Sequence, residues 1–184
     1  MKTYISILRG INVSGRKIIK MNDLQSLYQG LEFKNITTYI QSGNVIFQYK
    51  EVDTKSLEVK IAKQIEITFG FEVPVIVLTI GELQQIVNNN PFLKDVDKKS
   101  EFLHVTFLGS TPEQYNREMI DEKKQPGEEL FFTNQAIYLY CPNGYGNTKL
   151  NNSFIEKKLK VSATTRNWKT TNELLKIGII SSSN

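Results

Sequence analysis

Four short segments of this chain carry the side chains best suited to binding a ligand. They are Arg9–Asn12, Gln41–Asn44, Asn143–Lys149 and Thr164–Trp168. Guanidinium and ammonium groups hold carboxylates and phosphates through charge-assisted hydrogen bonds, and amides and hydroxyls orient them. The chemistry indicated is therefore the recognition of a small anion. The candidate binding residues, with one lysine from the loop after the first segment, are Arg9, Asn12, Lys20, Gln41, Ser42, Asn44, Gly144, Tyr145, Gly146, Lys149, Arg166, Asn167 and Trp168.

Two basic stretches coincide with these segments. The first 22 residues contain five lysines and arginines and no acid, and residues 157–172 again contain five bases and no acid. Lys17 and Lys20 lie on a long loop, which could form a lid over an anionic ligand, but a solvated side chain is the favoured interpretation for Lys17. Two acid-free windows beside polar loops favour an anionic ligand.

The segment Asn143–Lys149 has features of an anion cradle. Gly144 and Gly146 permit close backbone approach, Lys149 adds a charge, and a helix is expected from about Leu150, whose free N–H groups favour an anion. The spacing matches neither the phosphate-binding loop G-x-x-x-x-G-K-[ST] nor a dinucleotide fingerprint. The alternative is a glycine-rich turn that only connects a strand to a helix.

The arginines in the other segments also have two readings. Arg166, Asn167 and Trp168 offer a guanidinium, an amide and an aromatic face for a ligand, or else Trp168 anchors the last helix and Arg166 braces a loop. Arg9 either faces a ligand or holds the Gln41–Asn44 turn through its carbonyl groups.

No catalytic residue can be assigned. The chain has one histidine and one cysteine, too few for a zinc site of the usual type. No metal or cofactor is expected, although a magnesium site made of carboxylates stays open. His104 falls on a strand face with Phe102 and Thr106, where a structural role is expected, and Cys141 is expected to be a small buried hydrophobe. Whether the protein is an enzyme stays open.

The elements that position these residues repeat a β-α-β-β-α-β order. In residues 1–80 we expect strands near 3–9, 36–40, 45–49 and 73–78, with helices from Asn22 or Asp23 and over 54–70. Residues 81–100 form a linking helix and loop. In residues 101–184 we expect strands near 102–108, 130–133, 136–140 and 161–164, helices opening at Thr111 and near Leu150, and an extra helix over about 170–177. The fold class predicted is α/β (α+β), a tandem duplication of two ferredoxin-like units with mainly antiparallel sheets.

This topology pairs the polar segments. The first and second strands of a unit run parallel, so Arg9–Asn12 is expected beside the Gln41–Asn44 turn. In the second half the third and fourth strands end together, which brings Asn143–Lys149 to Thr164–Trp168.

The same segments carry a family resemblance. Leu8–Val13, Thr38–Val45, Asn143–Gly146, Lys149-Leu150 and Ala163–Trp168 are similar, in order, to the bacterial domain-of-unknown-function 1697 family. The resemblance implies a duplicated α/β fold over nearly the whole chain and implies no activity. One departure is Ser14-Gly15, where the family more often has two glycines.

Composition narrows the function classes. The chain has 184 residues, 40% hydrophobic and 23% charged, with a net charge of +4, values ordinary for a globular protein. Nothing approaches a membrane span or a signal peptide, and a cytoplasmic monomer or homodimer is expected. Binding of a small anionic metabolite is the first hypothesis. The alternatives are single-stranded nucleic-acid binding, which the low charge makes unlikely, and a non-enzymatic protein-interaction module.

Overall fold

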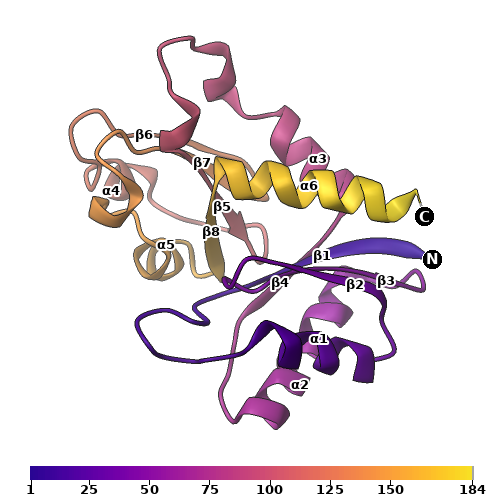
Figure 1. Ribbon diagram of the computed structural model, residues 1–184. Helices are drawn as coiled ribbons and strands as arrows, with labels where there is room; N and C mark the ends of the chain where they lie inside the picture. The colour runs from indigo at the N-terminus through magenta and orange to yellow at the C-terminus, as the bar shows by residue number, and fades with distance from the viewer. Residues whose placement is uncertain (184) are drawn as a thin grey trace. The chain divides into compact units, whose positions relative to one another are not determined.

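A computed structural model describes residues 1–183, which form two compact units (Figure 1). The first unit contains residues 1–84 and 173–184, and the second contains residues 85–172. Each unit has the order β-α-β-β-α-β and one four-stranded antiparallel sheet. The predicted fold class is confirmed, and the two similar units are what a tandem duplication gives. The sequence-based division at residues 80 and 100 differs from these units chiefly in placing the C-terminal helix with the second half.

The first unit follows the predicted order closely. Its elements are β1 (Lys2–Leu8), α1 (Met21–Gly30), β2 (Lys34–Tyr39), β3 (Asn44–Tyr49), α2 (Thr54–Phe69) and β4 (Val75–Thr79). The strand order is β2-β3-β1-β4. Helix α2 begins at the cap Asp53 and ends at Gly70, whose φ of 79° is the left-handed conformation that glycine adopts readily.

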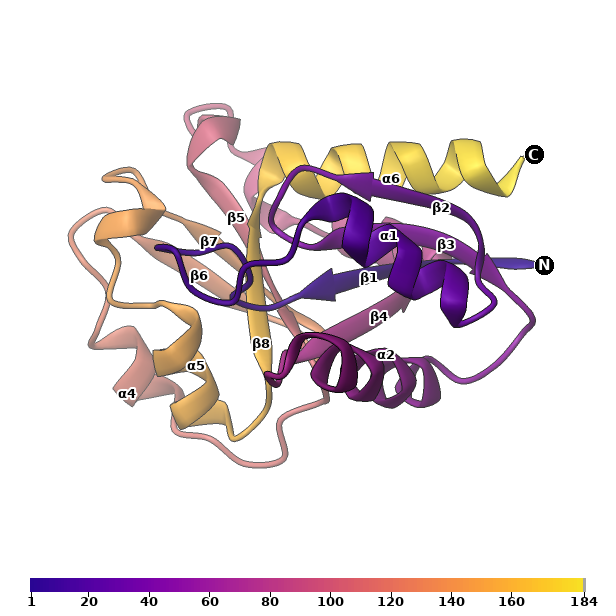
Figure 2. The same ribbon diagram turned by 60° about the horizontal axis from the view of Figure 1, so that its bottom comes forward.

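The side chains of β1 point alternately to the two faces of its sheet. Tyr4 lies on the face covered by α1 and α2, in a core with Tyr28 and Phe47 (Figure 2). Ile5 lies on the other face, where the part of α6 (Trp168–Ser182) that belongs to this unit packs. A Cβ on Gly178 of α6 would come within 2.3 Å of Ile80 Cδ1, so the missing side chain permits this close packing.

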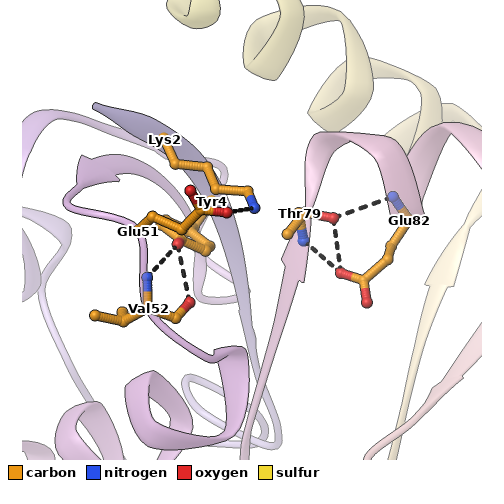
Figure 3. A network of polar contacts seen from close by, with 6 residues as sticks. All are labelled: Lys2, Tyr4, Glu51, Val52, Thr79 and Glu82. Atoms are coloured by element: carbon orange, nitrogen blue, oxygen red, sulfur yellow. Dashed lines mark hydrogen bonds and ion pairs between the residues drawn. The ribbon is translucent and has the colours of Figure 1, made fainter.

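Polar contacts fix the chain where strands become helices or loops (Figure 3). Glu82 accepts hydrogen bonds from the backbone N–H and the hydroxyl of Thr79, and its own N–H donates to the Thr79 hydroxyl. This capping box starts α3 (Ile80–Asn88) directly after β4. The Tyr4 hydroxyl bonds both the carbonyl and the N–H of Val52, and Lys2 pairs with Glu51 at the surface.

The second unit repeats the pattern with shorter helices. Its elements are β5 (Leu103–Leu108), α4 (Arg117–Asp121), β6 (Glu129–Phe132), β7 (Ala136–Tyr140), α5 (Asn152–Leu159) and β8 (Ala163–Asn167), in the strand order β6-β7-β5-β8. Short 3-10 turns occupy Pro91–Lys94, Ser100–Phe102 and Tyr145–Asn147. The core between this sheet and helices α4 and α5 contains Ile120, Ile137 and Ile155.

Several predicted boundaries were wrong. The helix expected from Thr111 begins only at Arg117, because the Asn116 side chain supplies the cap by accepting from Met119 N. Helix α1 starts after Lys20 without any side-chain cap, although Asn22 or Asp23 was expected to provide one.

The end of the chain also differs from the prediction. The last strand spans Ala163–Asn167 instead of 161–164, because Lys160 ends α5 in the left-handed conformation and the chain straightens only afterwards. The final helix runs from Trp168 to Ser182, well beyond the predicted 170–177. No helix within residues 1–183 has the length and apolar character needed to cross a bilayer.

Candidate functional site

The predicted convergence of two loops in the first unit is present. We call Arg9, Asn12, Gln41, Ser42 and Asn44 the β1-end cluster. The N–H of Leu8 donates to the carbonyl of Gly43 at 2.8 Å, and Asn12 Nδ2 donates to the carbonyl of Gln41 at 2.8 Å. The parallel course of β1 and β2 therefore places these loops together, as the topology predicts.

Asn12 closes the β1-end cluster with its side chain. Its Nδ2 also donates to the carbonyl of Ile19, and its Oδ1 accepts from Ile19 N at 2.8 Å. The residue itself has a φ of 55°, a conformation that asparagine tolerates better than most residues. The amide thus ties the ends of the 10–20 loop to the hairpin turn, which is the structural role of a good loop-former.

Asn44 is fully buried, and its side-chain amide also hydrogen-bonds within the β1-end cluster. Its Nδ2 donates to the carbonyl of Tyr39 at 3.1 Å and to the hydroxyl of Ser42 at 2.8 Å. Between them Gly43 has a φ of 76°, and a Cβ there would lie 2.7 Å from Leu8 Cβ. The turn is therefore packed directly against the end of β1.

Three cations of the first unit, Arg9, Lys17 and Lys20, follow β1 in the chain. Arg9 is half-buried, and its backbone N–H donates to the carbonyl of Pro74. Lys20 is exposed immediately before α1, as is the side chain of Gln41. Lys17 donates from Nζ to the carbonyl of Glu72 at 2.6 Å, so this lysine braces its loop.

In the second unit the start of β5, the end of β8 and the loop after β7 contribute to another cluster, with His104 and Thr165 on one face of the sheet and Thr164 and Arg166 on the other. We call His104, Tyr145, Thr164, Thr165 and Arg166 the β8-end cluster. Arg166 is only 9% exposed, and Nη1 donates to Thr164 Oγ1 and to the carbonyl of Thr165, both at 3.0 Å. Burial lowers the pKa of Arg166 to about 10, and the nearby Tyr145 opposes this effect.

Tyr145 stacks on His104, with ring centroids 4.9 Å apart and an interplanar angle of 23°. The sequence placed His104 on the same strand face as Thr106, and the register confirms it, since these residues oppose Asn167 and Thr165. Burial lowers the pKa of His104, and the hydrogen bond between its Nδ1 and the Phe102 carbonyl partly offsets this. Burial thus favours the neutral form of the imidazole.

A chain of hydroxyls runs through the β8-end cluster. Thr165 donates to Asn152 Oδ1 at 2.6 Å, so its single hydroxyl proton is committed there. The 2.7 Å contact between Thr106 Oγ1 and Thr165 Oγ1 must then have Thr106 as the donor. The sequence analysis missed this chain, because it depends on the strand register and on the N-terminal residue of α5.

Tyr145, which stacks on His104, links the loop Asn143–Lys149 to the β8-end cluster. The N–H groups of Gly144, Asn147 and Thr148 donate to carbonyls of residues 141–145. Helix α5 starts at Asn152, two residues later than expected, with Asn151 capping Phe154 N. Gly146 and Lys149 are exposed. These backbone donors serve the turn itself.

Asn167 and Trp168 mark the start of the last helix. Asn167 Oδ1 accepts from Thr170 N at 2.8 Å, and its carbonyl accepts from the Thr171 hydroxyl. Trp168 is 9% exposed. The amide thus acts as a helix cap and the indole is largely buried, so both residues have a clear structural role.

Cys141 has the buried position expected of it. Its side chain is inaccessible, and burial, with a smaller effect from the charge of Glu128, raises the pKa of its thiol to about 12. A thiol with such a pKa stays protonated and is a poor nucleophile. Within residues 1–183 no group of three His, Cys, Asp or Glu side chains is placed to hold a metal ion.

Aromatic side chains alternate along the β2–β3 hairpin (Tyr39, Phe47 and Tyr49) and along β7 (Tyr138 and Tyr140), a pattern that in some sheets stacks nucleic-acid bases. Phe47 and Tyr138 are at most 1% exposed. Tyr39, Tyr49 and Tyr140 are half-buried, and Tyr49 contacts Phe33 and the ammonium of Lys60. Phe47 and Tyr138 are thus unable to stack on bases.

These observations define a two-unit α/β protein with a polar cluster at strand ends in each unit. The chain belongs to the family described as "Protein of unknown function (DUF1697)", whose model matches residues 1–138. The predicted family is confirmed over that range, and the resemblance of Asn143–Gly146 and Ala163–Trp168 lies beyond it.

A solved structure supports the fold. The conserved bacterial protein SP0830 from Streptococcus pneumoniae is 21% identical, and the alignment covers 95% of this chain and 97% of that one with a TM-score of 0.68. At this identity the similarity establishes the fold alone. No curated protein matches the chain.

Proposed function

We propose that the protein binds a small anionic metabolite, such as a nucleotide or another phosphorylated compound, at the β8-end cluster. The observation that carries the proposal is the buried guanidinium of Arg166, whose pKa is lowered to about 10 by desolvation. Burying a cation is costly, and a bound anion offsets that cost directly. Its Nη1 donates to Thr164 Oγ1 and to the carbonyl of Thr165 at the end of β8.

The surrounding groups suit such a ligand. Charge-assisted hydrogen bonds to a desolvated guanidinium are stronger than neutral ones, at about 1.5–3 kcal/mol each. Tyr145, stacked on His104, places a phenol beside the arginine. The thiol of Cys141, whose pKa burial raises to about 12, is a poor nucleophile, and the function proposed is binding.

The proposal includes a cytoplasmic location in a bacterium and ferredoxin-like units. The strand orders β2-β3-β1-β4 and β6-β7-β5-β8 support the second point. A single buried cysteine, which needs no oxidising compartment, supports the first.

The test is a thermal-shift screen with inorganic phosphate, nucleoside monophosphates and sugar phosphates, followed by calorimetric titration of the compounds that stabilise. Arg166→Gln keeps donors and removes the charge, and we expect it to weaken binding about 10- to 100-fold. Lys169→Gln is the control, because it makes the same charge change three residues away at an exposed position.

Absence of stabilisation across the panel by the folded protein would contradict the proposal. Equal loss of affinity in the Arg166 and Lys169 variants would also contradict it, because the effect would then be one of net charge. A gel shift with single-stranded RNA or DNA at low salt examines the nucleic-acid alternative with the same variants.

A further inference from the structure

A hollow in the second unit, apart from the β8-end cluster, has a different chemistry. It has a volume of about 430 Å³ and lies between the end of α3 and the β6–β7 turn. Four amide side chains, those of Gln85, Asn89, Asn134 and Gln135, line it, together with threonine hydroxyls. None of its lining residues is charged. The volume lies within the usual range for small-ligand sites.

One pair of these amides comes from α3 and its end, and the other pair comes from the β6–β7 turn. Gln85 and Asn89 are one helical turn apart, and Asn89 N donates to the carbonyl of Gln85 at 3.0 Å. Asn134 and Gln135 form the tip of the β6–β7 turn. The hydroxyl of Tyr138 on β7 donates to the carbonyl of Ile86 on α3 at 2.8 Å, and this bond joins the two elements.

The turn that presents the second pair is itself fixed. Thr133 Oγ1 accepts from the N–H groups of Gln135 and Ala136 and donates to the carbonyl of Ala136 at 2.8 Å. The tip is thus ordered by its own hydroxyl, while the amides of Asn134 and Gln135 extend from it.

These four amides differ from most others in the unit. Among residues 85–172 nine asparagine and glutamine side chains hydrogen-bond to the protein itself as caps, turns or strand braces. They are Asn90, Asn116, Gln125, Asn143, Asn147, Asn151, Asn152, Asn167 and Asn172. The four around the hollow have no such bond among the described residues, so their donors and acceptors are available to a ligand.

We propose that this hollow binds a neutral saccharide. An amide presents a donor and an acceptor side by side, which matches a hydroxyl group that both donates and accepts. An uncharged lining gives no counter-ion for a phosphate or carboxylate, so the site is distinct in chemistry from the β8-end cluster. Tyr138 and Ile86, which also line the hollow, are at most 3% exposed, so the hollow offers no open aromatic face for stacking a nucleobase.

The test is NMR of the full chain with labelled side-chain amides, titrated with maltose, cellobiose and N-acetylglucosamine. We expect saturable shifts of the Gln85, Asn89, Asn134 and Gln135 amide signals with at least one of these probes. Asn89→Ala should weaken binding about fivefold, as the loss of a neutral hydrogen bond does. Asn88→Ala is the matched control, since Asn88 is exposed, adjacent in sequence and outside the hollow.

Arg166→Gln separates this proposal from the anion site and should leave saccharide binding unchanged. The saccharide proposal is overturned if none of the probes moves the four amide signals at millimolar concentrations. It is equally overturned if neutral nucleosides move them and saccharides do not, or if Asn88→Ala weakens binding as much as Asn89→Ala.

Discussion

The β1-end and β8-end clusters both lie where loops follow strand ends, yet they use their polar side chains differently. In the first, the amides of Asn12 and Asn44 are occupied by carbonyls and a hydroxyl of the same corner. In the second, the guanidinium of Arg166 is buried, donates to Thr164 Oγ1 and interacts with Tyr145. Similar residue types thus close a corner of the fold in one unit and surround a buried cation in the other.

This difference distinguishes polar side chains that stabilise the fold from polar side chains that indicate a binding site. A polar side chain whose bonds all go to its own loops stabilises the chain, and replacing it should change the free energy of unfolding first. A buried charge is weak support for stability and a stronger indication of a ligand. The following variants test each side of this comparison.

The largest effect is expected for Gly43→Ala. The new Cβ would lie 2.7 Å from Leu8 Cβ and 2.8 Å from Ile11 Cδ1, and φ is 76°. Overpacking and backbone strain together should lower the free energy of unfolding by about 3 kcal/mol or more, measured by urea denaturation. Gly10→Ala is the control, because φ is 72° but no atom lies within 4 Å, and about 1 kcal/mol is expected. Equal costs would show that the corner is not tightly packed.

Asn12→Ala should come next. It removes two donated hydrogen bonds and one accepted bond that link Ile19 and Gln41 to the loop. We expect a loss of about 2 kcal/mol in the same assay. Gln41→Ala keeps the backbone carbonyl that Asn12 uses and should cost less than about 0.5 kcal/mol. If the two variants cost the same, Asn12 is not the residue that closes the corner.

The sequence predicted the pairing of loops because strand direction alone decides which strand ends meet. The bond from Leu8 N to Gly43 O confirms that reasoning. It did not predict which polar groups are satisfied, because that depends on tertiary neighbours. The sequence, for example, indicates a helix end at Asn89 and a turn at Asn134. Only the folded structure places both residues around one hollow. The helix expected at Thr111 failed because a proline at a first helical position cannot outweigh the better cap at Asn116.

A smaller effect is expected within the β8-end cluster. Thr165→Val keeps the shape of the side chain and removes the hydroxyl that joins Thr106 to Asn152. We expect a loss of about 1 kcal/mol in the free energy of unfolding. Thr37→Val, on an exposed position of β2, should change stability by less than about 0.5 kcal/mol. A cost no larger than that of the control would mean that the hydroxyl chain contributes nothing to this cluster.

The smallest effect is a pH dependence that arises from His104. Its folded pKa is lowered by burial, so between the folded and the unfolded pKa, near 6.5, the unfolded state binds more protons. The contribution of His104 to stability is therefore fully present above that unfolded pKa and is lost as the pH falls from there through the lower folded pKa. His104→Phe retains a ring against Tyr145 and cannot titrate, so its free energy of unfolding should fall less between pH 7 and pH 5 than that of the parent chain. The same decline in both proteins would assign the pH dependence to carboxylates and place the His104 ring in a solvated environment, which would weaken the view of the β8-end cluster as desolvated.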